Sequence, residues 1–205
     1  EHVLIPRQDT EILVEEVLKE LHDGMRVLDM CTGSGCILLS LLHYSNDCEG
    51  LGVDLSAEAL EVAGRNVLKV LTPEKAEHAH FLQSDLFEKV EGKFEIIVSN
   101  PPYIASAEVE KLMPEVRDHE PRMALDGTED GLYFYRRIIE EAGKHLVSSG
   151  MLFFEIGYDQ GQAVSELMRT EGYCDVQVVQ DYAGLDRVVF GTYVTVQPAP
   201  FAKSR

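Results

Sequence analysis

The sequence predicts a single α/β domain built on a mostly parallel sheet with helices on both of its faces. Short β-like runs alternate with helical patterns from Met25 onward, as expected when crossover helices join parallel strands. The last two runs are separated only by Asp181–Asp186, which is too short for a crossover, so these two strands should pair antiparallel. The chain has 205 residues, 45% of them hydrophobic, which suits one domain with an ordinary hydrophobic core.

Seven segments have the composition of strands, and together they predict a seven-stranded sheet with one antiparallel strand. In chain order they are Met25–Met30, Gly50–Asp54, His80–Gln83, Phe94–Ser99, Met151–Ile156, Asp175–Gln180 and Arg187–Val194. The sequence that follows them, from about residue 195 to residue 205, contains two prolines and little pattern, which predicts a loose C-terminal tail.

Three segments have helical periodicity, and each has recognisable end signals. Thr10–Leu21 begins at a predicted cap, Asp9 or Thr10, and Leu132–Val147 is predicted to stop near Gly150. In the third segment, Ser56–Leu71, Ser56 is the predicted N-cap. There Leu55 and Leu60 are placed as a hydrophobic staple, and the residues at helical spacing are Leu60, Ala63, Val67, Leu68 and Leu71.

Acidic residues outnumber basic ones by two to one. The 36 Asp and Glu residues against 18 Lys and Arg residues give a net charge of −18 and a pI of about 4.7. A surface of this sign repels phosphate backbones, so the sequence predicts no stable nucleic-acid binding along a broad basic face. The longest apolar stretch, Cys36–Leu42, is far shorter than the roughly 20 residues of a membrane-spanning helix, so no membrane partner is predicted.

The cysteine pattern bears on metal binding and on compartment. The four cysteines form no Cys-x-x-Cys pair and have no histidine at metal-ligand spacing, so no metal site is predicted. Reduced thiols and the lack of a secretory signal at the N-terminus favour a cytoplasmic protein. The sequence does not begin with Met, which leads us to expect a trimmed chain.

A glycine-rich turn follows the first predicted strand and opens a helix. Its residues are Cys31, Thr32, Gly33, Ser34 and Gly35. Glycines here permit positive φ and let a ligand approach bare backbone near a helix N-terminus. A dinucleotide-binding fingerprint would need a small residue at Leu38, so NAD is the weaker interpretation. The Asp-x-x-x-Gly-x-Gly form instead resembles the cofactor loop of class I S-adenosylmethionine-dependent methyltransferases, although Cys31 stands where a glycine is usual.

Two carboxylates follow later strands at the same predicted edge of the sheet. Asp54 ends the second strand, 54 − 35 = 19 residues after Gly35, where a carboxylate can accept both hydroxyl protons of a ribose. Asp85 and Leu86 follow the third strand, and the resemblance to methyltransferases implies that they lie near the adenine amino group and against the adenine ring. The alternative is that Asp54 caps a helix and Asp85 is a turn residue.

The segment Asn100, Pro101, Pro102 and Tyr103 directly follows the fourth strand. The two prolines fix φ and remove backbone donors, while the Asn100 side chain and the Pro101 carbonyl offer two acceptors. With the flat face of Tyr103 they match a planar NH2 group, which predicts methyl transfer to an amide or an exocyclic amine. We therefore assign these four residues to catalysis and acceptor binding, with Asn100 also placed at the cofactor.

The segment alone leaves three acceptor classes open: adenine in DNA, guanine in RNA and glutamine in proteins. The surrounding sequence closely resembles the catalytic domain of the HemK-type protein-glutamine methyltransferases that act on peptide chain release factors. The matching stretches are Val3–Glu11 (with Gln8 where Pro is usual), Glu115–Pro121, Ala124–Gly127 with Glu129–Gly131, Glu155–Gly161 and Asp181–Arg187. Related ribosomal-protein glutamine methyltransferases differ at Arg7–Glu11 and are the second possibility.

This resemblance implies methylation of the glutamine in the Gly-Gly-Gln motif of class I release factors. The cofactor would be S-adenosylmethionine and the product S-adenosylhomocysteine. It also implies a catalytic domain over residues 1–194, a tail over 195–205, and an N-terminal helical docking domain that is absent from this chain. The remaining alternatives are a nucleic-acid amino-methyltransferase and a non-catalytic, cofactor-binding scaffold.

The sequence does not decide the roles of four charged residues in the matching stretches. Arg7 and Asp9 are candidates for ordering the N-terminal segment beside the cofactor, and Glu120 is a candidate partner of Arg117. Arg187 is equally open. Ordinary salt bridges or helix caps explain each of them as well as an active-site role does.

Overall fold

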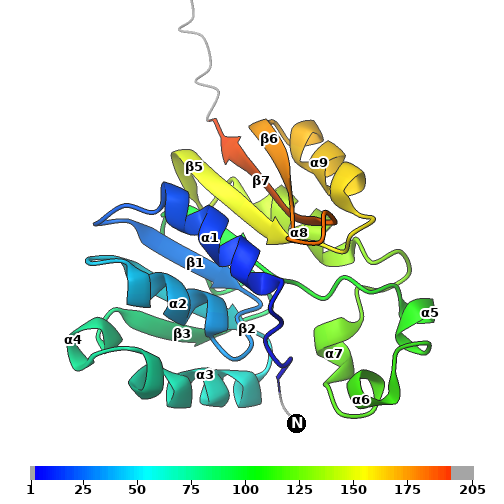
Figure 1. The fold of residues 1–205 in the computed structure, drawn as a ribbon. Helices are drawn as coiled ribbons and strands as arrows, with labels where there is room; N and C mark the ends of the chain where they lie inside the picture. Colours follow the sequence, from blue (N-terminus) through cyan, green and yellow to red (C-terminus); the bar gives the residue numbers. More distant parts are fainter. Residues whose placement is uncertain (1–2, 195–205) are drawn as a thin grey trace, which may run out of the picture.

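The computed structural model describes residues 3–194 and contains one seven-stranded sheet in the order β3-β2-β1-β4-β5-β7-β6 (Figure 1). The strands are β1 (Arg26–Met30), β2 (Glu49–Asp54), β3 (Ala79–Gln83), β4 (Phe94–Ser99), β5 (Leu146–Glu155), β6 (Tyr173–Gln180) and β7 (Asp186–Tyr193). Only β7 runs against its neighbours, pairing antiparallel with both β5 and β6. The predicted sheet with one antiparallel strand is confirmed, whereas the predicted tail, 195–205, lies outside the described residues.

Helices cover both faces of this sheet. The helices of eight or more residues are α1 (Thr10–Glu20), α2 (Cys36–Tyr44), α3 (Ala57–Val70), α8 (Tyr133–Ala142) and α9 (Gly161–Thr170). Shorter ones are α4 (Pro73–Ala76), α5 (Ser106–Val109), α6 (Pro114–Arg117) and α7 (Arg122–Leu125). Helices α1 and α2 pack on one face, α8 and α9 on the other, and α5 to α7 form a small lobe inserted between β4 and α8 (Figure 1).

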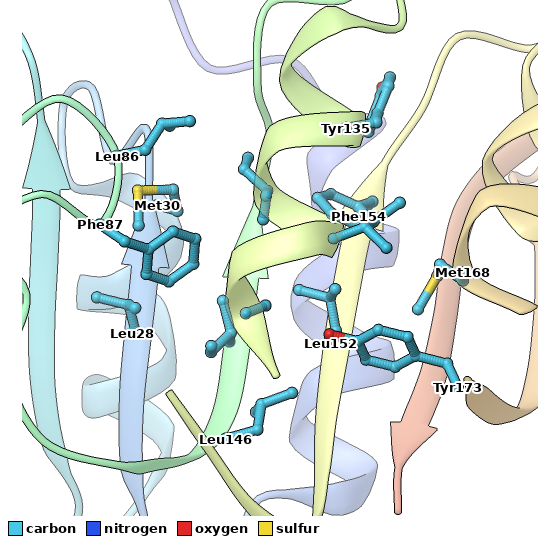
Figure 2. Packing of buried hydrophobic residues seen from close by; sticks show 14 of the residues in the cluster. Leu28, Met30, Leu86, Phe87, Tyr135, Leu146, Leu152, Phe154, Met168 and Tyr173 are labelled. Carbon is cyan, nitrogen blue, oxygen red and sulfur yellow. The ribbon is translucent and has the colours of Figure 1, made fainter. Parts of the chain in front are cut away.

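The core consists of two clusters of buried side chains, one on each face of the sheet. On one face, Leu13 of α1 and Leu38 of α2 are fully buried with Val27 of β1. On the other, Tyr135 of α8 and Met168 of α9 belong to a second cluster, shown in Figure 2 with side chains of β1 and β5. Among the described residues, no helix is long and apolar enough to cross a membrane.

The predicted helix Leu132–Val147 is wrong at its C-terminal end. The helix ends at Ala142, and Leu146 already belongs to β5, where its side chain is buried. A Cβ at Gly143 would come within 2.7 Å of the Tyr193 ring, so the chain turns there at a residue that leaves room for β7. Apolar periodicity alone cannot distinguish the last helical turn from the first residues of a buried strand.

The capping predictions have mixed outcomes. Ser56 caps α3 as predicted, because its hydroxyl accepts a hydrogen bond from the Ala59 amide at 3.1 Å. The predicted staple and the full apolar stripe are wrong, since Leu55 is 54% exposed and Leu68 is 79% exposed. Asp9 occupies the N-cap position of α1 without a side-chain capping bond, and its carboxylate lies 3.5 Å from the Arg187 guanidinium instead.

Candidate active site

The candidate site lies where the order of the sheet reverses. Strands β1 and β4 are parallel neighbours in the middle of the sheet, and Met30 pairs in register with Ser99. The next residues, Cys31 and Asn100, therefore leave the sheet side by side although they are 69 positions apart in the sequence. Open α/β sheets bind ligands in the crevice at such a switch point, outside the carboxyl ends of the strands.

A pocket of about 600 Å³ opens at this edge, which is within the usual size range of small-molecule and cofactor sites. It is lined by residues that the sequence singled out, namely Cys31, Thr32, Gly33, Ser34, Asp54, Asp85, Leu86, Asn100 and Pro102. The other side is closed by Leu4 and Pro6 of the N-terminal segment and by residues 121–124 of the inserted lobe. Segments far apart in the sequence thus enclose a single cavity.

The turn after β1 is held in a left-handed conformation. Cys31, Gly33 and Gly35 have φ values of 62°, 54° and 77°. Cys31 therefore adopts the backbone conformation for which glycine is the usual residue, at a cost of about 1–2 kcal/mol for a side chain with a Cβ. Burial raises the pKa of its thiol, so this side chain is a neutral part of the pocket wall.

Gly35 is the one residue of this turn that does not line the pocket. It is the N-cap of α2, and a Cβ there would come within 3.2 Å of the Ala63 Cβ and 3.3 Å of Leu39. Its contribution is to bring α2 close to α3. Gly35 thus shapes the turn without lining the pocket, and its cofactor-binding role stays a prediction.

Asp54 and Asp85 lie at the ends of neighbouring strands and have different partners. The Asp54 carboxylate accepts hydrogen bonds from the backbone amides of Gly33 and Ser56, each at 2.9 Å. It therefore connects the turn after β1 to the start of α3 and belongs to the pocket lining as well. Asp85 is joined to Arg137 of α8 at 2.9 Å.

The Asn100–Tyr103 segment separates the large pocket from a smaller one. Asn100 lines both, whereas Pro101 and Tyr103 line the smaller pocket of about 100 Å³ together with Arg7 and Glu155. Burial raises the pKa of Tyr103 to about 12, so its hydroxyl stays protonated.

The backbone of this segment is supported by a contact that the sequence did not reveal. The Gln160 side-chain amide donates hydrogen bonds to the carbonyl oxygens of Tyr103, at 2.9 Å, and Gly131, at 3.3 Å. The Gln160 side-chain oxygen accepts from the Gly157 amide at 2.9 Å. A Cβ on Gly131 would overlap the Tyr103 carbonyl oxygen, so the two backbones touch. The only sequence signal was that these residues lie in stretches resembling one family.

The structure shows the partners of the charged residues whose roles the sequence left open. Arg7 forms a short salt bridge with the buried carboxylate of Glu120, which ties the N-terminal segment to the inserted lobe. The predicted pairing of Glu120 with Arg117 is wrong, because Arg117 binds the adjacent Asp118 at 2.7 Å. Arg7 and Glu120 are 113 positions apart, so spacing in the sequence gave no indication that they pair.

Arg187 is buried and contacts the N-terminal segment at Asp9. Its guanidinium contacts Asp181 at 3.1 Å and Asp9 at 3.5 Å, and it donates to the Ile156 carbonyl oxygen at 3.3 Å. It lines neither of the two pockets. Its contacts make it a link between β7, the end of β5 and the start of α1.

We expect Asp29, below the turn, to make stability pH-dependent. Burial raises its pKa to about 7 despite hydrogen bonds from Thr32 and the Leu38 amide. The folded chain then keeps a proton that the unfolded chain loses near pH 4, so stability falls as pH rises from about 4 to about 7. Between pH 5 and 8 the wild type should lose about 3 kcal/mol more unfolding free energy than Asp29→Asn.

Urea denaturation at both pH values measures this difference. The exposed Asp23→Asn variant is the matched control and should follow the wild type. Parallel stability curves for wild type and Asp29→Asn would contradict the expectation.

Comparisons with known proteins agree on one family. Residues 7–116 match the methyltransferase small domain family. The chain is 45% identical over 192 residues to the release factor glutamine methyltransferase of Thermodesulfovibrio yellowstonii and 46% identical over 191 residues to that of Clostridium acetobutylicum. Each alignment covers 91% of this chain, and 67% and 66% of the respective relative, so the chain spans about two thirds of their length.

Solved structures support the same conclusion. The crystal structure of the release factor-specific protein-(glutamine-N5) methyltransferase of Alicyclobacillus acidocaldarius is 30% identical, with a TM-score of 0.54 over 93% of this chain and 95% of that one. A methyltransferase from Pyrococcus furiosus has a TM-score of 0.67 at 16% identity, over 94% of this chain and 89% of that one, and so shares the fold. The predicted class I methyltransferase fold and the HemK-type resemblance are confirmed: the chain belongs to the release factor glutamine methyltransferase family.

Proposed function

We propose that this chain transfers a methyl group from S-adenosylmethionine to the side-chain amide nitrogen of the glutamine in the Gly-Gly-Gln motif of class I peptide chain release factors. The observation that carries the proposal is the position of Asn100, which lines both the large pocket and the small one beside Tyr103. A cofactor in the first and an amide in the second would meet at this residue.

The polar groups that line the large pocket suit those of S-adenosylmethionine. Each Asp54 carboxylate oxygen accepts one backbone hydrogen bond, which leaves lone pairs free for the two ribose hydroxyls. Asp85 uses one oxygen for Arg137, so it can still accept from an adenine amino group, and Leu86 offers an apolar side chain next to it. The left-handed turn at Cys31–Gly33 exposes backbone to the remaining, amino-acid part of the ligand.

The chain's own residues would hold and orient the acceptor. In this proposal the Asn100 side-chain oxygen and the Pro101 carbonyl would accept the two amide N–H groups, and the Tyr103 ring would lie against the amide plane. When bound, S-adenosylmethionine would supply an electrophilic methyl group, whose bond to sulfur would break as S-adenosylhomocysteine leaves. As the acceptor nitrogen forms its new bond to carbon and becomes tetrahedral, its N–H groups become more acidic and the hydrogen bonds to Asn100 and Pro101 strengthen. The nitrogen then loses one proton, and no general base is assigned.

A protein acceptor agrees with the charge of the chain. The net charge of −18 disfavours a long nucleic-acid groove and suits a translation factor with basic surfaces. The residues around the pocket also resemble the release factor enzymes at Arg7–Glu11, where ribosomal-protein glutamine methyltransferases differ. The four cysteines are free thiols, which supports the proposed cytoplasmic location.

Intact-mass analysis tests the proposal. Purified protein and S-adenosylmethionine are incubated with a class I release factor, with the same factor carrying Gly-Gly-Ala, with a ribosomal protein and with an adenine-containing oligonucleotide. We expect one methyl group on the wild-type factor alone, mapped to the glutamine. Methylation of the ribosomal protein or the oligonucleotide, with an unmodified release factor, would overturn the proposal.

A further inference from the structure

Glu155 is a buried acid that the steps above do not use. It is the last residue of β5 and is 2% exposed. Among the described residues, its Oε2 atom has no hydrogen-bond partner. A buried carboxyl group with an unpaired oxygen destabilises the folded protein, because both desolvation and the missing hydrogen bond cost free energy. Its presence next to the site therefore calls for a functional explanation.

Its position places Glu155 at the acceptor side of the site. It lines the small pocket together with Asn100, Pro101 and Tyr103, and it does not line the large pocket. The end of β5 lies beside the end of β4, since Ser99 pairs in register with Phe154. Glu155 and Asn100 are therefore the next residues on two adjacent parallel strands.

The groups facing Glu155 come from several elements. Burial raises the pKa of its carboxyl group, while hydrogen bonding to Thr10 of α1 and to the Asn100 side chain, together with the charge of Arg187, opposes that shift. Asp9 adds a second negative charge nearby. Asn100 is the next residue on the adjacent strand and lines the same small pocket, so its NH2 group is a nearby donor for the unpartnered Glu155 oxygen.

A hydrogen bond between these two side chains would have a consequence for Asn100. The two ends of a side-chain amide are nearly equal in shape, and only hydrogen bonds decide which end points where. If the NH2 end faces a carboxylate, which accepts but does not donate, the oxygen is left for the pocket. A reversed amide would present donors to the N–H groups of an acceptor glutamine and would repel it.

We propose that Glu155 is a positioning residue that holds the Asn100 amide with its oxygen toward the acceptor, which selects an NH2-bearing group for methylation. The proposal rests on the function proposed above. The alternative is that Glu155 merely anchors the start of α1 through Thr10.

The test uses Glu155→Gln, which keeps the size of the side chain and removes its charge, so that it can either donate to or accept from Asn100. We expect kcat for the release factor to fall by roughly tenfold, because the amide is then held in both orientations. The KM for S-adenosylmethionine should not rise, and the melting temperature should not fall. Ser165→Ala, at a buried hydroxyl in α9 that also lacks a partner among the described residues, is the control and should keep full activity.

A second readout does not depend on turnover. The side-chain amide signals of Asn100, identified in the 15N–1H spectrum by their loss in Asn100→Ala, should shift in Glu155→Gln and stay in place in Ser165→Ala. Unchanged Asn100 signals, or full kcat in Glu155→Gln, would overturn the positioning role. If the wild type methylates no release factor, the proposed function fails, while the spectra still decide whether Glu155 holds Asn100.

Discussion

Asn100→Ala should lower kcat for the glutamine acceptor by about 100- to 1000-fold while leaving the dissociation constant of S-adenosylmethionine nearly unchanged. The side-chain oxygen of Asn100 is the acceptor whose hydrogen bond strengthens as the attacking nitrogen becomes tetrahedral, so its loss is felt in the transition state. The backbone of the segment should remain in place, because Pro101 and Pro102 are buried and fix their own φ angles.

Single-turnover kinetics and calorimetric titration of the cofactor separate the two effects. Asn46→Ala is the matched control, since Asn46 is exposed and precedes β2, at the opposite edge of the sheet from the pocket. It should match the wild type in both measurements. A normal kcat in Asn100→Ala, or a loss explained wholly by weaker cofactor binding, would be incompatible with the acceptor role.

Gly131→Ala should reduce both the stability of the protein and its turnover. Its φ of 72° disfavours any Cβ, and the new methyl group would overlap the Tyr103 carbonyl oxygen, which cannot move without disturbing its bond to Gln160. We expect the free energy of unfolding to fall by roughly 3 kcal/mol. Displacing the backbone at Tyr103 should also reduce kcat by about 100-fold.

Gly172→Ala provides the control for backbone strain alone. Gly172 has a similar φ of 88°, but a Cβ there would meet no atom within 4 Å. Its substitution should destabilise the protein by about 1–2 kcal/mol and leave kcat unchanged. Urea denaturation and kinetics on both variants measure the difference. Equal destabilisation of the two would mean that the contact between Gly131 and Tyr103 carries no energy.

Residue patterns and loop lengths predicted the strands of the sheet well. They were less reliable for features that depend on contacts between two helices or strands. The Ser56 cap and the antiparallel end of the sheet depend on neighbours in the chain, so pattern and loop length were sufficient. The predicted C-terminal end of α8 was wrong, because Leu146 continues the apolar pattern of the helix although it already lies in β5. Leu68 follows helical spacing but remains 79% exposed, since spacing does not say where another element will cover a face.

The same distinction applies to the site. The turn after β1 and the Asn100–Tyr103 segment are contiguous, so their residue types indicated their chemistry. The Arg7–Glu120 salt bridge joins residues 113 positions apart, and the bond from Gln160 to Tyr103 spans 57. No periodicity reports such pairs, because they depend on how the chain crosses the sheet. The structure therefore adds the contacts that hold the site in shape, whereas the candidate reacting groups were already indicated by the sequence.

The placement of β7 has a consequence for synthesis of the chain. Among the described strands, β7 is made last, yet it lies between β5 and β6, and β6 is joined to the sheet through its pairing with β7. During translation, β6 emerges from the ribosome with its native partner still unmade, and its pairing must wait for residues 186–193. A nascent chain interrupted before that point would expose the edge of β5 and leave β6 unpaired, which are features that promote aggregation.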